Sequence, residues 1–235
     1  MEPATIFERL EKKFVLNPAE YRAIHEIVAQ HIPPDTFGEY LVQSLYFDTD
    51  NWDVIRASIE RPVYKEKLRL RCYNVPSMSS TVFLELKKKY NGVVNKRRIL
   101  FPLEELHNKT PRDIAAADKS QIGRELDFYL KANPVYEKAH ISYKRAAYAG
   151  AGLRITFDTD IRFRTTLLDY EHPMGGPAVL PDNLTVMEVK IPGGMPLWLA
   201  QALSRYKIFS TSFSKYGAGY KKFVLQKGDV GSWNF

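Results

Sequence analysis

Cations occupy every second position of EKLRLRCY, residues 66–73. Lys67, Arg69 and Arg71 alternate with apolar residues, so a β-strand would carry all three on one face. Forked guanidinium groups and ammonium groups bind phosphate oxygens through charge-assisted hydrogen bonds. The spacing therefore predicts a strand with one face suited to binding anions.

The same alternation recurs in five other predicted strands. The cations that it places on these faces are Lys13, Lys87, Lys96, Arg98, Arg154 and Lys190. One interpretation is an antiparallel sheet with one face in the core and the other in water, but such exposed faces usually mix Thr, Ser and both signs of charge. A dry interior could not hold so many like charges, because each buried unpaired ion is costly. We therefore expect the charged faces to converge on a hydrated tunnel that binds a polyanion.

Three glutamates accompany these cations, each two residues before a lysine. They are Glu11 in EKK, Glu85 in ELK and Glu188 in EVK. Neutralising ion pairs are one interpretation. Carboxylate oxygens beside phosphates are also what Mg²⁺ or Mn²⁺ requires. We expect Glu188 to be the first metal ligand, with Glu85 and Glu11 as the other candidates.

The composition is that of a globular protein. The chain has 235 residues, of which 45% are hydrophobic, and a formal net charge of +7 that favours phosphate-bearing partners. No stretch approaches the roughly 18 consecutive apolar residues of a membrane span, and the N-terminus lacks a signal peptide's apolar region. Cys72 is the single cysteine, which excludes an intrachain disulfide and favours a reducing compartment. We expect a cytoplasmic protein.

Seven or eight strands and three or four helices would position these residues. Asn17 and Pro18 begin a helix as N-cap and first helical residue, and Asn91–Gly92 favours a tight hairpin. Residues 102–133 are expected to be helical, and a further helix begins at Pro196. We predict one domain over residues 1–225 with a flexible tail at 226–235. Its class is α+β: an eight-stranded antiparallel β-barrel, forming the tunnel, with helices packed outside.

A series of motifs in order resembles the VTC domain, the catalytic module of the vacuolar transporter chaperone complex and of stand-alone bacterial relatives. The motifs are FERLEKKF, SLYFDT, KLRLRCY, FLELKKK, KRR, SYKRAAY, LRITFD, MEVK and SFSKY. They run from about Glu8 to Phe223. This family belongs with the triphosphate tunnel metalloenzymes, which are eight-stranded antiparallel barrels. The resemblance implies an ATP:polyphosphate phosphotransferase that transfers the γ-phosphoryl group of ATP to a growing polyphosphate chain with Mn²⁺ or Mg²⁺.

The resemblance also implies roles for individual residues. Those expected to be catalytic are Arg69, Arg71, Lys87, Arg145 and Lys215. Those expected to bind phosphate are Lys13, Lys96, Arg154 and Ser214, and the alternation of the strands adds Lys67, Arg98 and Lys190. Alternation places Arg145 on the face of Ile141 and Tyr143, which we expect to be apolar, so a bulge near Ala146 would be needed to turn it toward phosphate.

Other functions stay open at this point. An inorganic triphosphatase would use water as the acceptor, although ERLEKK lacks the fuller ExExK typical of related tunnel enzymes. A non-catalytic module that binds polyphosphate or inositol phosphates would need the cations but not Glu188. Nucleic-acid binding is disfavoured, because the aromatic residues do not interleave with the basic ones. The five histidines are expected to be structural or on the surface, and the sequence does not indicate the oligomeric state.

Overall fold

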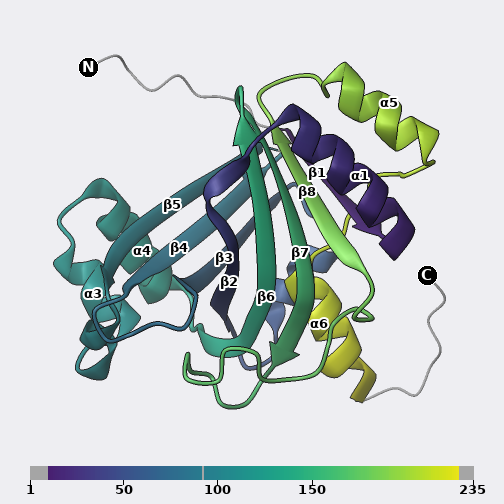
Figure 1. Ribbon diagram of the computed structural model, residues 1–235. Helices are drawn as coiled ribbons and strands as arrows, with labels where there is room; N and C mark the ends of the chain where they lie inside the picture. The colour runs from purple at the N-terminus through teal and green to yellow at the C-terminus, as the bar shows by residue number, and fades with distance from the viewer. Residues whose placement is uncertain (1–9, 92, 228–235) are drawn as a thin grey trace. The chain divides into compact units, whose positions relative to one another are not determined.

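A computed structural model describes residues 10–91 and 93–227 (Figure 1). The strands are β1 (Leu10–Leu16), β2 (Pro34–Asp48), β3 (Tyr64–Tyr73), β4 (Thr81–Tyr90), β5 (Val93–Pro102), β6 (Tyr136–Gly150), β7 (Leu153–Arg164) and β8 (Thr185–Ile191). The α-helices are α1 (Pro18–His31), α2 (Asp53–Ile59), α3 (Pro111–Ala117), α4 (Gln121–Ala132), α5 (Leu197–Arg205) and α6 (Lys215–Phe223). Two short 3₁₀ helices are η1 (Leu103–His107) and η2 (Leu225–Lys227).

All eight strands form one sheet in the order β1-β8-β7-β6-β2-β3-β4-β5. The expected α+β class with an eight-stranded antiparallel sheet is confirmed. Among the described residues no ladder joins β1 to β5, so backbone hydrogen bonds do not close the sheet into the expected barrel. The outer edge of β1 instead meets Thr211, whose N–H donates to the carbonyl of Lys13 at 2.7 Å.

The chain divides into two compact units, and the long strands β2, β6 and β7 contribute to both. Unit 1 comprises residues 1–40, 144–160 and 180–213, and unit 2 comprises residues 41–143, 161–179 and 214–235. Each unit has its own cluster of buried apolar side chains.

In unit 1, α1 packs on the apolar side chains of β1, β7 and β8. The helix begins where expected, because the Asn17 side chain accepts hydrogen bonds from the backbone of Ala19 and Glu20, and Glu20 reciprocates in a capping box. Ile24 and Val28 are buried on the side that faces the sheet. Helix α5 lies beside α1 (Figure 1) and belongs to the same apolar cluster.

In unit 2, the alternation seen in the sequence is confirmed. Leu68, Leu70 and Cys72 of β3 are buried, as are the alternate apolar residues of β4. The β4–β5 hairpin pairs Tyr90 with Val93, as the tight turn predicted, although Gly92 itself lies outside the described residues. The stretch expected to be helical resolves into η1, α3 and α4, because Thr110 and Ser120 each cap a new helix.

Helix α6 was not assigned from the sequence, because KYGAGYKKF contains two glycines and has a low intrinsic helix propensity. Tertiary contacts stabilise it. Ser214 caps its N-terminus, and the Tyr216 hydroxyl donates to Asp48 at 2.8 Å. The same carboxylate accepts from the backbone N–H groups of Val54 and Ile55 at the start of α2, so Asp48 joins both helices to β2.

The predicted tail at residues 226–235 falls mostly outside the described residues, and its first two residues end η2. No described helix combines the length and the apolar character that crossing a bilayer requires.

We expect Gly219→Ala to destabilise the protein, because a Cβ there would lie 2.2 Å from the Phe163 ring. Overpacking of this kind costs about 1–3 kcal/mol of unfolding free energy. Gly217→Ala is the matched control, since its nearest contact, Cβ of Ser214, would be an ordinary 3.4 Å. It should be neutral or stabilising, as alanine favours a helix over glycine. Urea unfolding followed by circular dichroism measures both, and equal effects would contradict the packing argument.

Candidate functional site

A carboxylate of β4 in unit 2 is surrounded by cations from the two neighbouring strands, β3 and β5. We call Arg69, Glu85, Lys96 and Arg98 the Glu85 cluster. Register places Arg69 of β3 and Arg98 of β5 on either side of Glu85 in β4. Arg69 donates through Nε and Nη2 to Oε2 of Glu85 at 2.9 and 2.7 Å, while Nζ of Lys96 lies 3.3 Å from Oε1. Nη1 of Arg98 is 4.0 Å from the same Oε1.

Charge rather than burial decides the state of Glu85, whose side chain is only 1% exposed. Burial alone would raise its pKa, but Arg69, Arg71 and Lys96 outweigh that effect and lower the pKa to about 2. Burial and the neighbouring arginines lower the pKa of Lys96, against the attraction of Glu85. The cluster therefore holds one ionised carboxylate among an excess of positive charge.

Arg71 extends this excess without a carboxylate of its own. It is 8% exposed, and its Nε and Nη2 donate to the hydroxyl groups of Ser44 at 3.0 Å and Tyr143 at 3.3 Å. No acidic group in the described part of the chain forms an ion pair with it. A buried guanidinium with only neutral partners favours an anion beside it.

Two tyrosines accept hydrogen bonds from these arginines, and neither was predicted from the sequence. Tyr46 accepts from Nη1 of Arg69 at 2.9 Å, and Tyr143 accepts from Arg71. Burial would raise the pKa of Tyr46, but Arg69, Arg71 and Lys67 lower it to about 7. The sequence contains a signal from which this role could have been predicted. Alternation within SLYFDT places Ser44, Tyr46 and Asp48 on one face of β2.

The remaining predicted residues of unit 2 lie on the same strands or at the start of α6. Lys67 and Lys96 stand opposite Lys87 in register, on its two neighbouring strands. Lys67 Nζ lies 5.8 Å from the centre of the Tyr216 ring. Lys215 Nζ lies 4.5 Å from the centre of the Tyr143 ring, and Ser214 accepts from the Gly217 N–H as N-cap.

Unit 1 carries a second set of charged residues, with a different balance. Glu11 stands opposite Lys190 and Lys13 stands opposite Glu188, so the signs alternate across the β1–β8 ladder. Within each strand Lys13 Nζ lies 3.3 Å from Glu11, and Lys190 Nζ lies 2.7 Å from Glu188. The two lysines of this ladder therefore each have a carboxylate nearby.

The two arginines predicted in unit 1 are also paired. Arg145 makes a bidentate pair with Asp158 at 2.6 and 2.7 Å. Arg154 donates to Asp35 at 2.8 Å and to the Tyr40 hydroxyl at 3.2 Å. The expectation that the Tyr143 face of β6 is apolar was wrong, because Tyr143 itself binds Arg71. Arg145 needs no bulge to lie among polar groups.

The donors around Glu188 fit a hard cation. Thr156 stands opposite Glu188 on β7, and its buried hydroxyl oxygen has no hydrogen-bond partner among the described residues. A carboxylate and a hydroxyl are oxygen donors of the kind that Mg²⁺ or Mn²⁺ binds. Within residues 10–91 and 93–227 no three acidic, histidine or cysteine residues gather as a metal site. At this position the described residues offer two neighbouring oxygen donors, a carboxylate and a hydroxyl.

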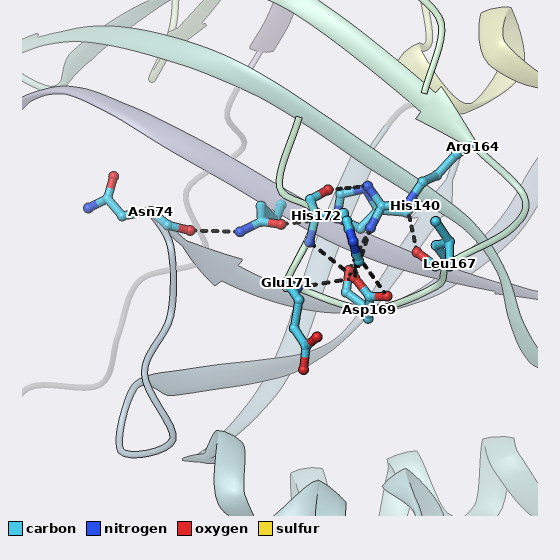
Figure 2. Close-up of polar contacts among 8 residues, drawn as sticks. Asn74, His140, Arg164, Leu167, Asp169, Glu171 and His172 are labelled. Atoms are coloured by element: carbon cyan, nitrogen blue, oxygen red, sulfur yellow. Dashed lines mark hydrogen bonds and ion pairs between the residues drawn. The ribbon is translucent and has the colours of Figure 1, made fainter. Parts of the chain in front are cut away.

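The histidines have structural contacts. His140 is fully buried and bonded to Gln43, which donates in turn to the Asn74 carbonyl, and burial lowers the pKa of His140 to about 3 (Figure 2). His25 bonds the Tyr148 hydroxyl at 2.8 Å, and His31 stacks on Trp198. These contacts agree with the structural role expected from the sequence.

We expect Glu85→Gln to lower stability in a pH-dependent way. Because the pKa of Glu85 is depressed in the folded state, its contribution is complete above the unfolded pKa and is lost as the pH falls from about 4.5 through 2. The shift corresponds to roughly 3 kcal/mol at pH 7. Urea unfolding at several pH values should show that the difference in unfolding free energy between the unmodified protein and Glu85→Gln becomes smaller below about pH 5.

Glu104→Gln, at an exposed glutamate, is the control and should change little at any pH. A Glu85→Gln effect that stays constant down to pH 3 would contradict the assigned ionisation, since roughly half of the linkage range lies above that pH.

Known proteins resemble this chain in sequence and in fold. A family model described as the VTC domain matches residues 8–224. A candidate adenylate cyclase from Bacillus halodurans has the same fold, with a TM-score of 0.53 and 13% identity over 92% of this chain and 99% of its own. A protein from Pyrococcus horikoshii is also similar, with a TM-score of 0.45 and 14% identity over 93% of this chain and 99% of its own. No curated protein matches the sequence. The chain belongs to the VTC domain family.

Proposed function

We propose that this chain is a metal-dependent polyphosphate polymerase. It transfers the γ-phosphoryl group of ATP to the end of a growing inorganic polyphosphate chain and releases ADP. Membership of the VTC family supports this activity, and the proposal includes ATP and polyphosphate as partners and a cytoplasmic location. The observation that carries it is Arg71, a buried guanidinium whose described partners are two hydroxyl groups and no carboxylate.

Arg71 and Arg69 suit phosphate because their guanidinium groups are already held in place. Ser44 and Tyr143 fix Nε and Nη2 of Arg71, which leaves Nη1 without a partner in the described part of the chain. Glu85 fixes Arg69 through two of its nitrogens. Donors that are oriented before the substrate arrives lose little entropy on binding and stabilise negative charge on phosphate oxygens.

The predicted site residues then fall into two groups according to their proposed role. Arg69, Arg71, Lys87, Arg145 and Lys215 orient the reacting phosphates. Lys13, Lys67, Lys96, Arg98, Arg154, Lys190 and Ser214 bind phosphate oxygens. Phosphoryl transfer depends mainly on positioning and charge neutralisation, and the acceptor is an ionised terminal phosphate. The chain therefore needs neither a nucleophilic residue nor a strong general base.

Glu188 and Glu11, with the Thr156 hydroxyl, would hold Mn²⁺ or Mg²⁺ in unit 1. When bound, the ion supplies a Lewis acid that neutralises phosphate charge. Glu85 was the third candidate ligand. Since both of its oxygens are ion-paired, we assign it the task of holding Arg69 and Lys96.

Arg71→Ala should reduce chain growth from ATP by at least about 100-fold, because removing one oriented donor costs that much in comparable sites. It should also abolish the rise in melting temperature that tripolyphosphate produces in the unmodified protein. The unliganded variant should melt near the unmodified protein, since a buried charge without a carboxylate partner is lost. Arg22→Ala, at an exposed arginine of α1, is the control.

Three outcomes would overturn the polymerase proposal. Release of orthophosphate from tripolyphosphate without chain growth would identify a triphosphatase. Binding of polyphosphate without ATP turnover would identify a binding module. If Arg71→Ala retained transfer activity, Arg71 would not be needed for the reaction, and the proposal would lose its main support.

Glu188→Gln should separate metal dependence from phosphate binding. The amide keeps the size of the side chain but weakens its bond to a divalent cation, so half-maximal transfer should need at least about tenfold more Mn²⁺. Tripolyphosphate should still raise the melting temperature without metal, because Arg71 and the Glu85 cluster are unchanged. An unaltered Mn²⁺ requirement would exclude Glu188 as a ligand.

A further inference from the structure

Unit 2 contains a cleft on the face of β2 and β3 opposite the cations. Its floor includes Leu45 and Phe47 of β2 and Leu70 of β3, which alternate with Ser44, Tyr46 and Arg71 on the other face. The cleft has a volume of about 740 Å³. That is within the range of roughly 300–1,000 Å³ found for small-molecule sites. Nothing in the proposed phosphoryl transfer uses this cleft.

The walls of the cleft are held in place by hydrogen bonds. The buried Arg164 side chain donates to the carbonyls of Leu167 at 2.6 Å and Asp169 at 2.8 Å, and also to that of His172 (Figure 2). Asp169 in turn accepts from the backbone N–H of Glu171 at 3.1 Å. These bonds fix the loop that carries Leu168 and Tyr170 into the lining, so the cleft is formed before any ligand arrives.

Tyr170 lines the cleft, but its hydroxyl is buried away from it. Its side chain is 6% exposed, and its hydroxyl makes no hydrogen bond to any described residue. Burial, with smaller contributions from Cys72 and Glu137, raises its pKa, so it stays a neutral hydroxyl. Because the hydroxyl oxygen has almost no accessible surface, Tyr170 offers the cleft only the apolar part of its side chain.

The charges that line the cleft are unevenly compensated. Lys109 pairs with Glu105 at 2.7 Å, and Arg112 lies 3.8 Å from Asp127, a carboxylate that it shares with Lys131. Asp169 pairs with Arg164 and His172.

The carboxylates of Glu137 and Glu171, by contrast, have no ion pair or hydrogen bond with another side chain in the described ranges. The uncompensated charge is therefore negative, although the whole chain carries a net charge of +7.

We propose that this cleft binds a small organic cation in which an ammonium group is joined to an apolar body. The body lies on Leu45, Phe47 and Leu70. The ammonium group donates to the carboxylates of Glu137 and Glu171. The volume suits one small molecule, and the net positive charge of the protein would by itself disfavour such a ligand.

Calorimetric titration with three ten-carbon amphiphiles below their micellar concentrations tests the proposal. Decylammonium should bind at one saturable site, and decanoate and decyl maltoside should bind at least about tenfold more weakly. The methyl signal of Met78, which lines the cleft, should shift in the NMR spectrum with decylammonium. No ATP or phosphate is present, so this result is independent of the proposed polymerase activity.

Substitutions test which side chains bind the ammonium group. Glu137→Gln combined with Glu171→Gln should weaken decylammonium binding at least about tenfold. Glu60→Gln, outside the cleft, and Tyr170→Phe, which removes a hydroxyl that the ligand does not reach, should leave it unchanged. Circular dichroism checks that each variant is folded. Tyr170→Phe removes an unpaired hydroxyl and should fold.

Equal binding of the three amphiphiles, no saturable binding, or unchanged affinity in the double variant would overturn the proposal. So would a stronger site for an apolar basic peptide, which would identify a protein partner instead.

Discussion

The ionised carboxylate of Glu85 is the constraint on which the cation-rich face of unit 2 depends. The two strands beside β4 bring Arg69, Lys96 and Arg98 around it, and it is almost completely buried. Without this negative charge, the adjacent guanidinium and ammonium groups would repel one another. Glu85 thereby keeps arginine side chains oriented on β3 and β5 while leaving the face positive overall.

The two units compensate their charges differently. In unit 1, Lys13, Lys190, Arg145 and Arg154 each have a carboxylate within ion-pairing distance. In unit 2, three cations share Glu85, and the described partners of Arg71 are neutral. A phosphate would compete with existing ion pairs in unit 1, whereas in unit 2 it would relieve an excess of positive charge. Unit 2 is therefore the stronger candidate for anion binding in the absence of metal.

The two faces of β3 support different chemistry. One face carries Arg69 and Arg71 with their hydroxyl and carboxylate partners, and the other carries Leu68, Leu70 and Cys72. The apolar face is mostly covered by the core, but at Leu70 it also forms part of the floor of a cleft with unpaired acidic side chains at its edge. Strict alternation along one strand thus separates a cationic surface from an apolar one.

Local patterns in the sequence determined the eight antiparallel strands, the face on which each cation lies, and the start of α1 at Asn17, because these depend on the backbone periods of two and 3.6 residues and on capping by neighbours. The partners of those cations were decided only by tertiary structure. Arg71 meets Ser44 and Tyr143, which are 27 and 72 residues away, and α6 forms despite its glycines because it packs on Phe163 and Asp48. Register between distant strands sets these contacts, and periodicity within one strand carries no information about register.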